Sequence, residues 1–373
     1  MSRILGWDIG GAHLKAALLR SETVVEVRQV PCALWQGLDR LDQAIDEALS
    51  GWPDAAAYAL TMTGELCDLF ADRASGVRTI VALLQRRLGG APIDVYAVDG
   101  TFLSAEAAMS APERVASANW HASAQFAASR QRDGLLIDIG STTSDLVPLK
   151  DGTVAAQGKD DAERLALDEL VYRGVVRTPV MALASHVVLE ERRAGIMAEL
   201  FATTADIYRL TGELPEHADL HPTADGRDKS PGESRARLAR MVGRDRSSAP
   251  DATWDAFARQ LADGIETTVT EAAERVLQAA RVARDAPIIG AGVGRFLAAR
   301  VARRLDRHYR GFDELIAAAQ PRSAAMAADC APAVAVALLR SGAASSAARS
   351  RTTASASSGP ARRPVVSAER KPR

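Results

Sequence analysis

The same short pattern occurs twice in this chain, at positions that differ by 130. Asp8-Ile9-Gly10-Gly11 in the first copy aligns without a gap with Asp138-Ile139-Gly140-Ser141 in the second. In each copy an apolar run leads into a turn and a second apolar run follows, which is typical of a β-hairpin. A duplicated hairpin predicts two lobes of similar architecture, with the two hairpin tips facing each other across a cleft.

Each hairpin tip has the composition of an anion-binding turn. Glycine lets the backbone close in, so that successive N–H groups point into one concavity, and the second tip adds three hydroxyl groups. We therefore predict that both tips bind phosphate, through Gly10, Gly11, Gly140, Ser141, Thr142 and Thr143.

A carboxylate stands at the base of each tip, at Asp8 and Asp138. Two like charges about 4 Å apart repel by roughly 4 kcal/mol at an effective dielectric constant of about 20, so a bound phosphate needs a counter-charge there. Mg²⁺ binds carboxylate and phosphate oxygens together, which predicts Asp8 and Asp138 as its ligands. Lys15 would bring a positive charge to a terminal phosphate or pair with Asp145. The alternative is that both aspartates only cap N–H groups of their own turns.

Other candidate site residues lie at strand ends and in the second lobe. Glu65 follows a buried strand and is a candidate general base or anchor for a substrate amine, with helix capping as the alternative. A third glycine turn joins a strand to a helix, where backbone donors and the helix dipole favour polar or anionic groups; a tight packing turn is the alternative. Arg177 is a candidate anion contact or a surface charge. The residues predicted to bind substrate or nucleotide are Thr63, Arg177, Gly290, Gly292 and Gly294.

Composition fits a soluble globular protein, since 47% of the 373 residues are apolar and 25% are charged. The segment 341–373 carries seven basic residues and one acidic residue in an Ala/Ser/Pro/Arg-rich background, and we predict that it is disordered. The body before it is acidic in balance, which disfavours nucleic acid as a partner. The apolar runs are too short to span a membrane and no signal peptide precedes the first strand, which predicts a cytoplasmic protein.

Hydrophobic periodicity gives an α/β chain with two lobes. In the first lobe we expect strands at 3–8, 14–19, 23–29, 57–61 and 93–98, with helices at 38–49 and 77–88. In the second lobe we expect helices over 165–171 and 196–210, then a polar segment at 211–228 and a long helix from 251 to about 285. The predicted domains are an N-terminal lobe at 1–130, a C-terminal lobe with a helical insertion at 131–340, and the disordered tail at 341–373.

Several segments resemble known proteins. The glycine motifs at Asp8, Asp138 and Gly290 resemble the phosphate-one, phosphate-two and adenosine motifs of the actin, sugar-kinase and heat-shock-chaperone superfamily. DIGSTTSD is most similar to the hydantoinase A/oxoprolinase branch. Four further segments resemble tetrahydromethanopterin-linked one-carbon transfer proteins, and among these they are similar to the condensing enzymes of methanofuran biosynthesis. The segments are TMTGELCD at 61–68, ELVYRGVVRTPV at 169–180, 198–208 and HPTADGRDK at 221–229.

This resemblance implies a two-lobed actin-like ATPase fold, which is ribonuclease H-like, with duplicated mixed-sheet lobes and a central cleft. It also implies a Mg²⁺-dependent transferase that joins an aminomethylfuran-methanol diphosphate to the phenol oxygen of γ-glutamyltyramine and releases pyrophosphate. In that reaction Asp8 and Asp138 would hold Mg²⁺. The catalytic residues would be Lys15, Glu65 and Asp138. Lys15 would assist the leaving group, and Glu65 would serve as base or amine anchor.

Two other functions fit the same tips. ATP would occupy them in an ATP-dependent kinase or a hydantoinase/oxoprolinase-like amidohydrolase, although Ala12-His13 and Lys15 depart from the residues usual in those enzymes. The other alternative is a nucleotide-binding protein without turnover. The expected partners are a small-molecule diphosphate ester and a phenolic amine acceptor, with neither nucleic acid nor a membrane; a homo-oligomer is compatible with the sequence.

Overall fold

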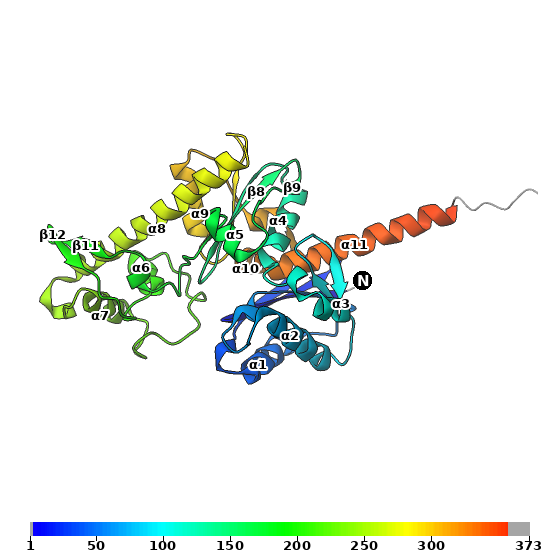
Figure 1. Ribbon diagram of the computed structural model, residues 1–373, viewed down its shortest axis with the longest axis horizontal. Helices are drawn as coiled ribbons and strands as arrows, with labels where there is room; N and C mark the ends of the chain where they lie inside the picture. The colour runs from blue at the N-terminus through cyan, green and yellow to red at the C-terminus, as the bar shows by residue number, and fades with distance from the viewer. Residues whose placement is uncertain (1–2, 357–373) are drawn as a thin grey trace, which may run out of the picture.

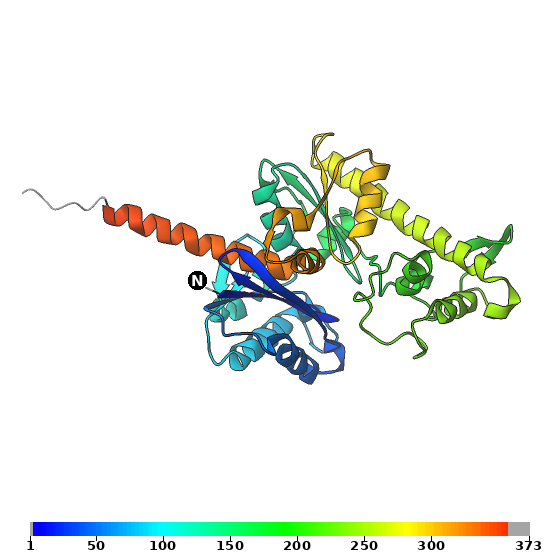
Figure 2. The same ribbon diagram turned by 180° about the vertical axis from the view of Figure 1, so that it is seen from behind.

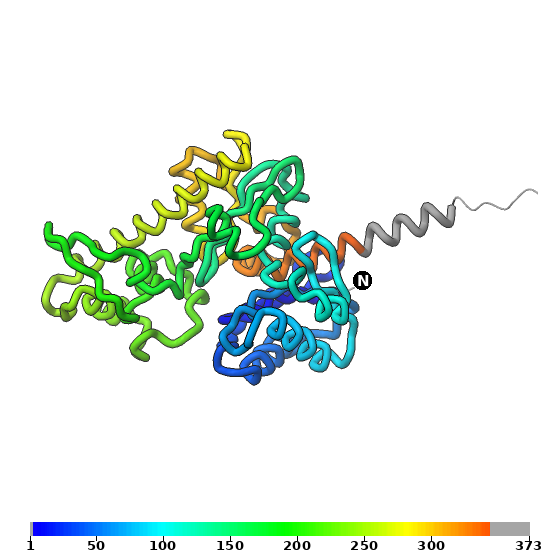
Figure 3. Tube along the Cα trace, in the orientation of Figure 1, coloured from blue at the N-terminus to red at the C-terminus, as the bar shows by residue number. Residues whose placement is uncertain are grey.

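The chain folds around two β-sheets, with helices packed between them and around them (Figures 1 and 2). The computed structural model describes residues 3–356, and side chains only as far as residue 343. Figure 3 traces the chain through the same orientation.

The first sheet has seven strands in the order β15-β3-β2-β1-β4-β5-β6. Strands β1, β2 and β3 form the expected antiparallel meander, whereas β4 runs parallel to β1 and β5 runs parallel to β4. The strands are β1 (Arg3–Ile9), β2 (His13–Arg20), β3 (Thr23–Pro31), β4 (Ala57–Met62), β5 (Ile93–Tyr96), β6 (Phe102–Ser104) and β15 (Ala317–Ala318).

The second sheet repeats the central part of this order. Its path β9-β8-β7-β13-β14 has the same relative strand directions as β3-β2-β1-β4-β5, and β10 pairs with the other end of β8. The strands are β7 (Gly134–Ile139), β8 (Ser144–Lys150), β9 (Thr153–Val154), β10 (Leu170–Val171), β13 (Ile288–Ala291) and β14 (Tyr309–Gly311). This repetition confirms the predicted α/β fold with duplicated mixed-sheet lobes.

Alternation along the first strand of each lobe decides where the aspartates point. In β1, Trp7 packs into the outer core of the first lobe, so the adjacent Asp8 points to the opposite, inner face. In β7, Ile137 packs into the core of the second lobe, so Asp138 also points inward. Because side chains alternate between the two faces of each strand, both carboxylates point toward the space between the sheets.

Helices cover the outer faces of the sheets and fill the space between them. The outer face of the first sheet packs against α1 (Leu38–Leu49), α2 (Arg73–Arg87) and α3 (Ala105–Ser110). The second lobe holds α5 (Asp161–Ala166), α8 (Asp251–Ala279) and α9 (Arg295–Arg304). A core shared by both sheets contains α4 (Asn119–Arg130), α10 (Pro321–Asp329) and the start of α11 (Ala331–Ala356).

The chain returns to the first lobe near its end, which corrects the predicted domain boundary. Strand β15 pairs with the edge strand β3, and α11 packs on β1, β2 and β4 because its first residues are almost all apolar and buried. Residues 317–343 thus leave the second lobe, to which we had assigned 131–340. Helix α11 also continues past residue 341, where we placed the start of the tail; the remainder, 357–373, lies outside the described residues.

The insertion packs on the outer end of α8, away from the first sheet (Figure 1). It contains β11 (His186–Leu189), β12 (Arg192–Gly195), α6 (Thr204–Thr211) and α7 (Pro231–Met241). Helix α6 starts only at Thr204 because Thr203 and Asp206 form a capping box, which corrects the helix expected over 196–210. The helix expected over 165–171 is wrong for its second half, where β10 bonds to β8 instead.

Within the described ranges, no single helix is long and apolar enough to cross a membrane. Helix α10 and the first part of α11 reach that length and hydropathy only together, as a pair bent by 105°. Most of the apolar residues of that pair belong to the core between the sheets.

The insertion predicts a measurable difference between a buried and an exposed ion pair. Arg237 is fully buried and donates to Asp206 Oδ1 from Nε (2.9 Å). Asp206→Ala removes one of the two carboxylate partners of Arg237 and leaves Asp225 (3.1 Å), so it should lower the free energy of unfolding by about 3 kcal/mol, measured by urea denaturation. Arg246→Ala, which breaks an exposed pair with Asp251, should cost less than about 1 kcal/mol. Equal effects would contradict this account of the insertion.

Candidate active site

The two hairpin tips have the same hydrogen-bonded geometry. The turn is closed by Gly10 N donating to His13 O (3.0 Å) in the first tip and by Gly140 N donating to Thr143 O (2.9 Å) in the second. Each acceptor lies three residues after its donor, and the two turns again differ by 130 positions. The alignment made from the sequence is therefore a structural equivalence.

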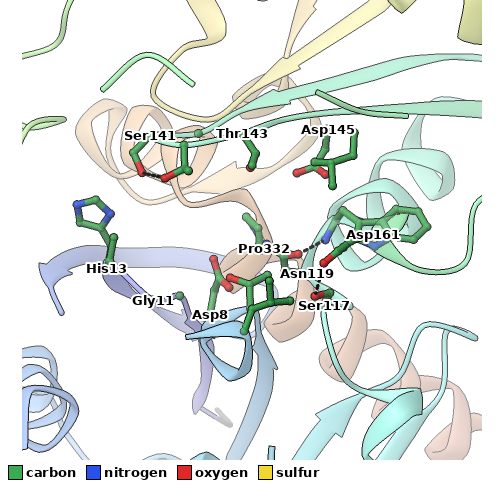
Figure 4. A pocket seen from close by; sticks show the side chains of 18 of the residues that line it. Asp8, Gly11, His13, Ser117, Asn119, Ser141, Thr143, Asp145, Asp161 and Pro332 are labelled. Atoms are coloured by element: carbon green, nitrogen blue, oxygen red, sulfur yellow. Dashed lines mark hydrogen bonds between the residues drawn. The ribbon is translucent and has the colours of Figure 1, made fainter. Parts of the chain in front are cut away.

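Both tips line one cavity of about 570 Å³ between the lobes (Figure 4). In Figure 4, Gly11 and Asp8 of the first tip lie opposite Ser141 and Thr143 of the second. The volume is typical of a small-molecule site. The cavity brings together most of the predicted site residues: Asp8, Gly10, Gly11, Lys15, Thr63, Asp138, Gly140, Ser141, Thr142, Thr143 and Arg177.

Four side chains at equivalent positions of the two hairpins line this cavity. In the register of the first hairpin, Asp8 lies opposite Lys15. At the equivalent position of the second hairpin, Asp138 lies opposite Asp145. The repeat therefore sets three carboxylates and one ammonium group together. Lys15 Nζ lies 3.5 Å from Asp8 Oδ2, so its closest acidic partner is in its own hairpin.

Burial and mutual repulsion change the protonation of this group. Burial, opposed by Lys15 and assisted by Asp145 and Asp8, raises the pKa of Asp138 to about 7. Burial also raises the pKa of Asp8 despite its contact with Lys15, and that of Asp145 despite its ion pair with Arg164. Burial disfavours the Lys15 ammonium, but Asp8 and Asp138 help to outweigh it, and the pKa of Lys15 is raised.

The two tip aspartates fit a divalent cation that phosphate completes. Asp8 Oδ1 is buried without a hydrogen-bond partner, so its lone pairs are free for a ligand. Among the described side chains, no group of three or more His, Cys, Asp or Glu residues is arranged to hold a metal ion. Mg²⁺ at Asp8 and Asp138 would therefore need phosphate and water oxygens for its remaining positions, which is its usual manner of binding.

Glu65 does not itself line the cavity. It is 1% exposed, and its Oε1 accepts hydrogen bonds from Ser117 N (2.9 Å) and Ser117 Oγ (3.0 Å). Thr63 before it and Leu66 after it do line the cavity, as does Ser117. Glu65 thus holds a cavity-lining residue in place, and its role as base or amine anchor stays a prediction.

The third glycine turn packs against the second tip and does not line the cavity. A Cβ atom on Gly292, whose φ is +79°, would lie 2.2 Å from Ile139 O and 2.5 Å from Asp138 Oδ1. At Gly294 a Cβ would lie 2.5 Å from Ile139 Cγ2, and Gly290 is in similar contact with the Tyr309 ring. The alternative of a tight packing turn therefore describes Gly290, Gly292 and Gly294, rather than direct ligand contact.

One end of the cavity contains residues that the sequence analysis did not select. Arg164 is 1% exposed; its Nη1 lies 2.9 Å from Asp145 Oδ1 and its Cζ lies 4.0 Å from the Trp120 ring centroid. Asp161 lies beside it and bridges to the first lobe through Arg73 Nη2 (2.8 Å). Only Asp145 could have been found, because it is the repeat partner of Lys15.

At the other end of the cavity, the insertion reaches the first tip. His221 Nε2 lies 2.8 Å from Ala12 O, and the His221 ring packs on His13 and Trp35. Burial lowers the pKa of His13 to about 3, with His221, Lys15 and Arg177 contributing. The polar segment expected at 211–228 therefore covers the site from outside both lobes, and the bond to Ala12 O is its direct link to the first tip.

Comparison with known proteins places the chain among named relatives. Residues 56–341 match the hydantoinase/oxoprolinase family. The chain is 32% identical over 291 residues to (4-{4-[2-(gamma-L-glutamylamino)ethyl]phenoxymethyl}furan-2-yl)methanamine synthase from Methanocaldococcus jannaschii, an alignment that covers 78% of this chain and 86% of that protein. A protein of the same name from Methanococcus vannielii is 34% identical over 108 residues, or 29% of this chain and 48% of that protein.

A solved structure of acetone carboxylase agrees with this architecture. A nucleotide-free structure of acetone carboxylase matches with a TM-score of 0.54 at 8% identity, over 81% of this chain and 67% of that chain. Component A of (R)-2-hydroxyglutaryl-CoA dehydratase from Acidaminococcus fermentans matches with a TM-score of 0.43 at 13% identity, over 91% of this chain and 97% of that chain. At these identities the likeness concerns the fold.

The raised pKa of Asp138 predicts a pH-dependent gain in stability on removing its charge. Between about pH 4 and 7 the folded state keeps a proton that the unfolded state has lost, so the wild-type protein loses stability as pH rises through this window. In metal-free buffer, Asp138→Asn should gain stability over wild type across the same window, by a few kcal/mol, and the difference should level off above pH 7. Thermal unfolding from pH 4 to 9 measures it, and the exposed Asp285→Asn is the control. A pH-independent difference would contradict the raised pKa.

Proposed function

The chain belongs to the hydantoinase/oxoprolinase family, and we propose that it is a synthase of methanofuran-type cofactor biosynthesis. In the proposed reaction an aminomethylfuran-methanol diphosphate condenses with γ-glutamyltyramine, and pyrophosphate is released. The name of the Methanocaldococcus jannaschii relative describes the ether that this condensation would give, and that relative aligns with most of this chain.

The observation that carries the proposal is the pair of equivalent tips lining one cavity. Backbone N–H groups and hydroxyls line it from both lobes, next to Asp8 Oδ1, which has no hydrogen-bond partner of its own. A diphosphate has two phosphoryl groups, which suits two matched turns. The third glycine turn, which a nucleotide would be expected to use, does not line the cavity within the described residues. This favours a diphosphate ester over ATP.

In the proposed reaction the protein stabilises pyrophosphate as the leaving group. The phenol oxygen of the acceptor forms a bond to the methylene carbon while the bond from that carbon to the diphosphate oxygen breaks. The electron pair leaves with pyrophosphate, and the phenolic proton passes to solvent. The N–H groups of the Gly10 and Gly140 turns and the Thr142 and Thr143 hydroxyls would hold the departing oxygens, and Lys15 would stabilise their growing charge.

The two tip aspartates would supply the remaining counter-charge through a cation. Bound Mg²⁺ would act as a Lewis acid on the diphosphate oxygens. Asp8 and Asp138 would hold it from the two lobes and so bring both tips onto one ligand. Without Mg²⁺, the two phosphoryl groups and the carboxylates of Asp8 and Asp138 would lie in the same cavity, and their mutual repulsion would cost several kcal/mol.

A coupled assay tests the proposed reaction. With both substrates and Mg²⁺, the purified protein should release pyrophosphate and form the ether in equal amounts, measured by enzymatic pyrophosphate detection and mass spectrometry. Either substrate alone should give neither product. Steady release of phosphate from ATP without the furan substrate would favour the kinase or amidohydrolase alternative. Tight nucleotide binding without any turnover would favour the non-catalytic one.

The metal assignment predicts a linked change in thermal stability. Mg²⁺ and pyrophosphate together should raise the Tm of the wild-type protein, because both bind the folded state. Asp8→Asn and Asp138→Asn should each abolish the Mg²⁺-dependent part of this rise, measured by scanning fluorimetry over a Mg²⁺ titration. Asp54→Asn, at an exposed position outside the cavity, should keep the full rise. If Asp8→Asn and Asp138→Asn also keep it, the cation is bound elsewhere.

A further inference from the structure

Two charged side chains that line the cavity are unpaired among the described residues. Arg177 enters the cavity from the second lobe and Asp68 from the first. Across the described part of the chain, neither side chain takes part in a salt bridge or a side-chain hydrogen bond. By contrast, Lys15 and Arg164, which also line the cavity, are each paired with an aspartate.

Arg177 is fixed in place through its backbone. Arg177 N donates to Ser141 O (2.8 Å), and the preceding Gly174 lies so close to the tip that a Cβ there would be 2.4 Å from Thr142 N. The guanidinium then crosses to the first lobe, where its Cζ lies 4.9 Å from the centroid of the Trp35 ring. Burial lowers the pKa of Arg177, which reflects a partly desolvated charge without a counter-ion.

The surroundings of this cation are aromatic and uncharged. The neighbouring histidines His13 and His221 both have lowered pKa values, chiefly through burial, and are therefore neutral at pH 7. Trp35 is 40% exposed and Tyr172 is 59% exposed, so two aromatic faces are open beside the charge. An arginine on an aromatic ring is well placed to bind a carboxylate through two parallel N–H bonds.

The charges at the opposite end of the cavity are already paired. Asp145 and Asp161 lie there, on the far side of Asp8 from His13 (Figure 4). Asp145 is paired with Arg164, and Asp161 is paired with Arg73. The acceptor of the proposed reaction carries the α-carboxylate of its glutamyl group, and charge complementarity places this carboxylate at Arg177, which has no counter-ion among the described residues.

We propose that Arg177 binds the free α-carboxylate of the γ-glutamyl acceptor, with Trp35 and Tyr172 beside its tyramine ring. A γ-linked glutamyl group keeps this α-carboxylate, which matches the Arg177 guanidinium. The site then selects γ-glutamyltyramine over plain tyramine. This inference rests on the proposed function for the identity of the acceptor.

Binding calorimetry with two acceptors tests the proposal without requiring turnover. The full-length protein should bind γ-glutamyltyramine at least about tenfold more tightly than tyramine, since a charged partner lost from a desolvated site costs roughly a factor of ten or more. Arg177→Gln should bring this ratio close to one while leaving tyramine affinity unchanged. Arg173→Gln is the matched control, because Arg173 is on the same loop but bonds to Thr268 outside the cavity.

The remaining outcomes are also decisive. Equal wild-type affinity for both acceptors, or no binding of γ-glutamyltyramine, would overturn the proposal. So would loss of pyrophosphate affinity in Arg177→Gln with an unchanged acceptor ratio, which would make Arg177 a phosphate ligand. If the acceptor preference holds but no pyrophosphate is released in the coupled assay, the proposed condensation fails and the carboxylate site stands.

Discussion

Electrostatic repulsion among buried carboxylates is the constraint on which this site depends. A duplicated hairpin necessarily duplicates its aspartate, and the strand alternation that buries Trp7 and Ile137 turns both copies inward. The fold balances this concentration of charge with Lys15 on one hairpin and Arg164 beside the other. Asp138 is still left with a pKa of about 7, so part of the imbalance persists. A cation-bound diphosphate is a ligand that would remove it.

Contacts between segments far apart in the sequence lie at both ends of the cavity. At one end Arg73 of the first lobe bonds to Asp161 of the second. At the other end His221 of the insertion bonds to the backbone of Ala12 at the first tip. The insertion therefore contacts the first tip, although it packs on α8 at a distance from both sheets. The cavity itself is lined by residues of both lobes.

The sequence predicted the centre of the site because its signals are local. The repeat aligned Asp8 with Asp138, and the glycines in the two turns identified both tips as anion-binding candidates. The sequence did not show that Glu65 and the glycines of the third turn lie outside the cavity lining, because their sequence context is the same whether a turn faces a ligand or packs against a neighbour. Gly292 is needed because Ile139 O lies where a Cβ would be, and no local pattern records that contact. Trp120 and Arg164 carry no motif, and only the meeting of the two lobes brings them to the same cavity.

The central claim is that the two equivalent tips bind one metal-bound pyrophosphoryl group, and crystallography with an anomalous scatterer tests it most directly. Crystals grown with Mn²⁺ and pyrophosphate should show an anomalous peak bonded to oxygens of both Asp8 and Asp138, about 2.0–2.3 Å away. The two phosphoryl groups should be held by the Gly10 and Gly140 turns. A peak outside the space between these aspartates, or pyrophosphate bound to one tip alone, would contradict the account.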